Sequence, residues 1–124
     1  MKVLALDFGS ARTGIAVTDP TGLVARPAGV VQRAATDSGF RRLLAVIGEE
    51  KPDLVVVGMP LTLRGEHGEQ ARETQAFAER LRGELDIPVE TYDERFTSVL
   101  ADGDDARAAA HLLSSFLEWR SAHR

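Results

Sequence analysis

The chain has 124 residues, of which 44% are hydrophobic and 27% charged, a composition typical of one soluble globular domain. It contains no cysteine, which excludes disulfides, thiolate zinc sites and thiol nucleophiles. The formal net charge of −4 argues against a sequence-independent coat on nucleic acid, although 13 of the 15 basic residues are arginine, whose side chain suits phosphate. No apolar run approaches the roughly 20 residues that cross a bilayer, and the N-terminus does not resemble a signal peptide, so we expect a cytoplasmic protein without a membrane partner.

The first part of the chain predicts three consecutive strands. They cover residues 2–9, 13–20 and 23–33, and residues 19–22 (DPTG) form a turn signal between the last two. Pro27 indicates an edge strand or an irregularity, because proline cannot donate to the ladder. Strands joined by such short turns favour an antiparallel meander.

Helices and strands alternate in the rest of the chain. Apolar residues at helical spacing predict helices over residues 36–52, 69–85 and 104–120. Apolar runs predict strands over residues 53–60 and 87–94.

The order of these elements, β-β-β-α-β-α-β-α, predicts a single α/β domain over residues 1–124. We expect a mixed five-stranded sheet with helices on its faces. Ligands in such sheets collect at the carboxyl ends of the parallel strands.

Acidic residues stand at several of these predicted ends. Asp7 lies near the end of the first strand, Asp93 and Glu94 end the last strand, and Asp104 and Asp105 open the last helix. If the first, fourth and fifth strands are neighbours, these groups converge at one edge of the sheet. Converging carboxylates repel each other unless they are protonated or bridged by cations, and Mg²⁺ or Mn²⁺ prefers oxygen ligands. Two such ions about 4 Å apart can activate water for phosphodiester cleavage.

Each acidic residue also has a structural interpretation. Asp7 could be a turn residue, and Asp104 and Asp105 could cap the last helix, where acidic groups are favourable. Asp93 is expected to pair with an arginine or to point away from the site, because adjacent strand residues face opposite ways.

Four stretches of the chain, in this order, share a pattern with known proteins: LALDFGSARTGIAVTD, VVVGMPLTLRGEHGEQA, VETYDERFTS and DARAAAHLLSSFLE. Together they resemble the YqgF/RuvX family of bacterial nucleases, described as Holliday junction resolvases and as nucleases of the 16S rRNA precursor. The resemblance implies a ribonuclease H-like fold, bound divalent metal and phosphodiester hydrolysis. It also implies that Asp7, Glu94 and Asp105 are the catalytic residues and metal ligands.

The chain departs from the family pattern in one place. The family usually carries a further helical, often basic segment before the last acidic residue, whereas only residues 98–104 separate Thr97 from Asp105 here. Either the segment was lost or it is missing from this chain. Asp104 therefore stays an alternative to Asp105 as the third carboxylate.

Four arginines are candidates for binding substrate phosphates. Arg12 lies in the hairpin after Asp7, and either a phosphate or a surface ion pair suits its guanidinium. Arg64 and Arg72 flank a glycine-containing loop and the start of a helix, whose free N–H groups suit phosphate, although an ordinary solvated loop has the same composition. Arg95 directly follows Glu94.

The leading functional hypothesis is a divalent-metal-dependent endonuclease acting on branched DNA, as Holliday junction resolvases do. The alternatives are an RNase that processes the 5′ end of pre-16S rRNA and a non-catalytic module that binds nucleic acid or acts in transcription. Phosphates do not distinguish DNA from RNA, so the sequence leaves this choice open. Symmetric cutting of a four-way junction favours a homodimer, and the end of the last helix (FLEWR, 116–120) suits a subunit contact.

Overall fold

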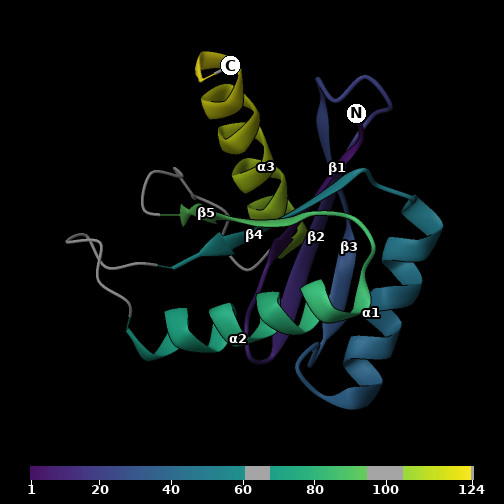
Figure 1. Ribbon diagram of the computed structural model, residues 1–124, viewed down its shortest axis with the longest axis vertical. Helices are drawn as coiled ribbons and strands as arrows, with labels where there is room; N and C mark the ends of the chain where they lie inside the picture. Colours follow the sequence, from purple (N-terminus) through teal and green to yellow (C-terminus); the bar gives the residue numbers. More distant parts are fainter. Residues whose placement is uncertain (61–67, 95–104, 124) are drawn as a thin grey trace.

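A mixed five-stranded sheet with helices on both faces organises the chain (Figure 1). The computed structural model describes residues 1–60, 68–94 and 105–123. The strands are β1 (Val3–Asp7), β2 (Arg12–Thr18), β3 (Ala25–Gln32), β4 (Leu54–Met59) and β5 (Val89–Asp93). The helices are α1 (Asp37–Glu50), α2 (Glu69–Glu84) and α3 (Asp105–Ala122). The predicted α/β order of elements is thus confirmed.

The strand order β3-β2-β1-β4-β5 places the first strand in the centre of the sheet. β1, β2 and β3 pair antiparallel, as the predicted meander requires, while β4 pairs parallel with both β1 and β5. Pro27 lies on the edge strand β3, where the register shifts between Ile15 and Ala16 of the neighbouring strand. The carboxyl ends of β1, β4 and β5 therefore lie at one edge of the sheet.

Side chains of β1 alternate between two apolar clusters. Leu4 and Leu6 pack with residues of α1 and α2, whereas Val3 and Ala5 pack with residues of α3. Figure 1 shows α3 on one side of the sheet and α1 and α2 on the other. Continuing this alternation puts the side chain of Asp7 on the α3 side and that of Phe8, a member of the α1–α2 cluster, on the other side.

Within the described ranges, no helix is both long enough and apolar enough to cross a membrane.

Candidate carboxylate site at the carboxyl edge of the sheet

The structure brings together two acidic side chains that are far apart in the sequence. Asp7 is the last residue of β1, and Glu94 follows the last residue of β5. Since β4 lies between these two parallel strands, both carboxyl groups reach the same edge of the sheet. Their side chains share a hydrogen bond.

The pKa of Glu94 is raised from its ordinary value of 4.5 to about 8. Burial of the carboxyl group is the main cause, followed by the hydrogen bond to Asp7 and the negative charges of Asp7 and Asp93. A hydrogen bond between two carboxyl groups needs one proton, and the raised pKa of Glu94 assigns that proton to it. Below about pH 8 the neutral carboxyl of Glu94 therefore donates to Asp7.

A glycine on the strand between the two carboxylates makes room for Glu94. A Cβ atom at Gly58 would lie 2.5 Å from Oε1 of Glu94, closer than real Cβ atoms come to other atoms. Gly58 pairs with Tyr92, two residues before Glu94. Sequence reasoning missed this role, although a lone glycine inside an apolar strand often marks a close approach.

The third predicted carboxylate, Asp105, lies at the start of α3 beside the same edge. The backbone carbonyl of Asp105 packs against Gly14 so closely that a Cβ there would overlap it, and Gly14 is the partner of Asp7 in the β1–β2 ladder. The carboxylate of Asp105 forms an ion pair with Arg12, in which Nε of Arg12 and Oδ2 of Asp105 are 3.0 Å apart. Across residues 1–60, 68–94 and 105–123, no three histidine, aspartate or glutamate side chains are arranged to hold one metal ion.

The other predicted site residues are placed as follows. Arg12 is half exposed beside Asp105, and Arg72 is exposed in the first turn of α2. Asp104, Arg64 and Arg95 lie outside the described residues.

The donor set of Asp7 and Glu94 fits a divalent cation. Two carboxylates in contact carry a repulsion that the fold relieves with a proton on Glu94. A hard dication offers the same relief while leaving both groups ionised, and carboxylate oxygens are the ligands that Mg²⁺ and Mn²⁺ prefer.

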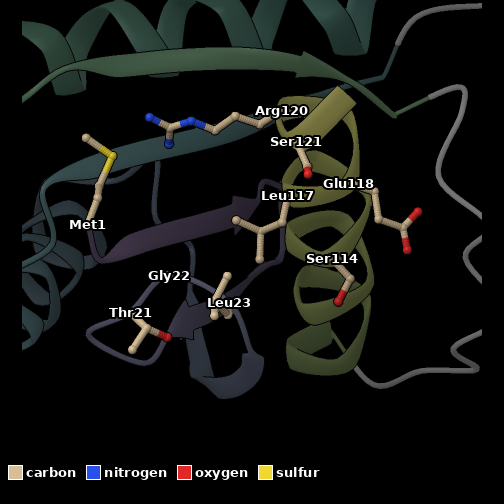
Figure 2. A pocket seen from close by; sticks show the side chains of 9 residues that line it. All are labelled: Met1, Thr21, Gly22, Leu23, Ser114, Leu117, Glu118, Arg120 and Ser121. Atoms are coloured by element: carbon tan, nitrogen blue, oxygen red, sulfur yellow. The ribbon is translucent and has the colours of Figure 1, made fainter. Parts of the chain in front are cut away.

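A cavity of about 670 Å³ lies away from this site, at the opposite end of β1 (Figure 2). It opens between the second half of α3 and the turn that joins β2 to β3, and Leu117 faces Leu23 across it. Met1, which precedes β1, also lines it, whereas Asp7 is the last residue of that strand. The carboxylate pair is therefore at a sheet edge, not in this cavity.

The strand order and the carboxylate pair define an α/β protein of the ribonuclease H-like class. In agreement, the fold resembles that of Thermus thermophilus RuvC solved in complex with a Holliday junction substrate, with a TM-score of 0.62 and 19% sequence identity. The match covers 98% of this chain and 96% of RuvC. The fowlpox virus Holliday junction resolvase gives a TM-score of 0.61 at 14% identity, over 96% of this chain and 99% of the resolvase.

The chain belongs to the RuvX family of nucleases. The family model, described as "RuvX: Holliday junction resolvase", matches residues 1–119. A protein of Maridesulfovibrio salexigens named "Putative pre-16S rRNA nuclease" is 39% identical over 104 residues, which are 84% of this chain and 77% of the relative. The relative of the same name from Synechocystis is 34% identical and matches 99% of this chain and 91% of its own length. That alignment spans 138 residues, more than the 124 of this chain, so the relative carries residues that have no counterpart here.

Proposed function

We propose that the protein is a divalent-cation-dependent endonuclease that hydrolyses phosphodiester bonds in branched DNA. The observation that carries the proposal is the contact between Asp7 and Glu94 at the carboxyl edge of the sheet. In parallel α/β sheets this edge is where ligands bind.

Asp7 and Glu94 would hold Mg²⁺ or Mn²⁺, with Asp105 as a third ligand if a second ion binds. A pair of such ions activates water and stabilises the leaving oxygen of a phosphodiester. Among the described residues Asp105 is held by Arg12, so its recruitment requires that this ion pair open. Asp104 stays the alternative third ligand.

Arginine side chains next to the site suit the task of orienting the substrate. Arg12 contacts Asp105 through Nε and is half exposed, which leaves its other N–H donors for a phosphate. The residue that precedes α2 is Gly68, so no side chain caps the first N–H groups of this helix. These N–H groups and the nearby Arg72 suit a second phosphate. Arg64 and Arg95 complete the proposed set.

The likeness to junction-bound RuvC supports a branched DNA substrate, which a two-fold symmetric homodimer would cut on both strands. The name shared by the relatives supports a second candidate, processing of the 5′ end of pre-16S rRNA. Both substrates would be met in the cytoplasm.

A cleavage assay on a labelled four-way DNA junction, a DNA duplex and a structured RNA tests the proposal. With Mg²⁺ or Mn²⁺ the parent chain should cut the junction in preference to the duplex, and EDTA should stop cleavage. Asp7→Asn should abolish cutting, because the amide keeps the shape but loses the charge that holds the cation. Asp86→Asn is the matched control, since Asp86 is exposed and precedes the opposite end of β5.

If the parent chain cut the RNA in preference to the junction, the proposed substrate would become the 16S rRNA precursor in place of branched DNA. Binding of all three nucleic acids without cleavage would leave a binding module. Cleavage by Asp7→Asn at the parent rate would overturn the role of the carboxylate pair.

A further inference from the structure

A second cavity of about 340 Å³ lies on the α1–α2 side of the sheet, beside α2 and the residues that follow β1. Its apolar wall consists of Phe8, Ala35, Ala76 and Phe77, and the rings of the two phenylalanines stack with centroids 4.3 Å apart. Phe8 directly follows Asp7 in the chain, although the two side chains leave the strand on opposite faces. The pocket therefore lies beside the residue that follows Asp7 in the chain, on the face of the sheet opposite to the Asp7 side chain.

The polar groups of this pocket are Ser10, Glu73 and Arg80. Arg80 is fixed in place: it donates to the carbonyl of Ala35 at 3.0 Å and to Asp37 at 2.9 Å. Its guanidinium carbon also lies 4.0 Å from the ring centre of Phe40, with the side chain 40% exposed. A planar cation held in this way costs little entropy when it stacks on a ligand.

Two further arginines lie before and after the pocket residue Ala35 in the chain, Arg33 after the end of β3 and Arg42 on α1. Arg42 donates to the carbonyl of Gln32 at 2.9 Å, and the backbone N–H of Arg33 donates to Ala11 in the β1–β2 hairpin at 2.9 Å. Arg33 is exposed and has a φ of 49°, a left-handed conformation that is uncommon for a residue other than glycine. Such conformations persist where surrounding contacts enforce them and concentrate at functional sites.

We propose that this pocket binds an unpaired nucleobase of the substrate strand, next to the phosphate that is cut. The inference rests on the proposed function in one respect, that the ligand is a nucleic acid. The strand would cross the end of the sheet, with a phosphate at the carboxylates, one base in the pocket, and neighbouring phosphates against Arg33 and Arg42.

The chemistry of the pocket matches a base better than a phosphate or a simple apolar ligand. Phe8 and Phe77 are buried and stack on each other, so they supply an apolar wall, and the partly exposed guanidinium plane of Arg80 is the surface that favours stacking of a flat ring. Glu73 accepts hydrogen bonds, so it suits the exocyclic amino group of adenine, cytosine or guanine, and it would repel a phosphate. Ser10 can donate to or accept from the remaining edge of the base.

The test fills the pocket without changing any charge. Ala76 is exposed on α2 and lines the pocket, so Ala76→Leu occupies the space, while Ala76→Ser leaves it open as the matched control. Phe8 is unsuitable, because it is buried in the core and its truncation endangers the fold. The probes are stem–loop oligonucleotides with 2-aminopurine as one unpaired base, made as DNA and as RNA, and the corresponding fully paired duplexes. Binding is measured in EDTA.

The parent chain and Ala76→Ser should quench 2-aminopurine fluorescence on binding. Ala76→Leu should bind the unpaired probe about tenfold more weakly and the paired duplex as the parent does, because base stacking is lost and phosphate contacts are kept. Equal affinity of Ala76→Leu and the parent for the unpaired probe, or an equal loss on paired and unpaired probes, would overturn the inference.

The two proposals fail in different ways. Quenching by a parent chain that cuts nothing in Mn²⁺ would overturn the nuclease proposal and support the base pocket. Cleavage by the parent chain without quenching of 2-aminopurine would support the nuclease proposal and overturn the base pocket. No binding of any stem–loop probe would overturn the base pocket, and the nuclease proposal would then be decided by the cleavage assay on the four-way junction.

Discussion

Replacement of Glu94 by glutamine should change how the stability of the protein depends on pH when divalent cations are removed. Glutamine has nearly the same shape as a protonated glutamate and can still donate to Asp7, but it does not ionise. Because the fold raises the pKa of Glu94 from 4.5 to about 8, the folded state favours its neutral form. This favourable contribution is fully present below about pH 4.5 and is lost as the pH rises through about 8.

The size of the effect follows from the pKa shift. At 1.36 kcal/mol for each pKa unit, the shifted pKa of Glu94 lowers the stability of the parent chain, relative to a side chain that does not ionise, by about 4 kcal/mol at pH 8 and by less than about 1 kcal/mol at pH 5. The stability advantage of Glu94→Gln over the parent chain should therefore grow by about 3 kcal/mol between these two pH values. Added Mn²⁺ should reduce the advantage at pH 8, because a cation stabilises the ionised pair only in the parent chain.

Urea unfolding in EDTA, followed by circular dichroism at pH 5 and pH 8, measures this difference. Glu90→Gln is the matched control, since Glu90 is exposed on β5, the strand that Glu94 directly follows. Its unfolding free energy should track that of the parent at both pH values. If the unfolding free energies of Glu94→Gln and the parent changed with pH in parallel, the reasoning that burial and Asp7 raise the pKa of Glu94 would be refuted.

Three further substitutions test other parts of the structure. Gly58→Ala should lower cleavage at least about tenfold, because the new Cβ would come within 3.0 Å of Cγ, Cδ and Oε1 of Glu94 and displace its side chain from the site; unchanged cleavage would show that Glu94 need not occupy this position. Thr13→Val should raise the unfolding free energy by about 1 kcal/mol, because within the described ranges the buried hydroxyl of Thr13 has no hydrogen-bond partner; a lower stability in urea would reveal a partner. Arg72→Ala should weaken nucleic-acid binding at low salt and flatten the salt dependence by about one phosphate contact; an unchanged salt slope in a titration would remove Arg72 from the binding surface.

The fold and the carboxylate pair were accessible from the sequence because both depend on simple regularities. Turn residues marked the ends of the first three strands, and helical spacing marked the helices between the later ones, so the mixed α/β order could be predicted. That β1, β4 and β5 are neighbours entered the sequence analysis only as a condition, which the strand order fulfils. Because β4 pairs parallel with both β1 and β5, the carboxyl ends of the three strands lie at one edge of the sheet. Asp7 and Glu94 therefore both lie at that edge, whatever the details of side-chain packing.

The remaining features depend on register and on long-range contacts, which residue patterns do not encode. The role of Gly58 requires its pairing with Tyr92, a register that only the assembled sheet defines. The position of Arg80 depends on Ala35 and Phe40, which come from a different part of the chain. Sequence reasoning proposed arginines in or beside the segments that follow predicted strands, and not Arg80, which lies in the second half of α2.

The contact of Arg12 with Asp105 lies between these cases. The sequence left a phosphate and an ion pair open for Arg12, and the start of α3 packs closely enough on Gly14 to bring Asp105 within 3.0 Å of the guanidinium Nε. The interpretation of Asp105 as a metal ligand stays a prediction.

Titration calorimetry with Mn²⁺ tests the central claim, that Asp7 and Glu94 form one cation site, more directly than any cleavage assay, because it does not depend on the choice of substrate. The parent chain and Asp86→Asn should bind Mn²⁺ with the same affinity. Asp7→Asn and Glu94→Gln should each bind at least about tenfold more weakly, since each removes a charged oxygen ligand. Unchanged Mn²⁺ affinity in both variants would contradict the account.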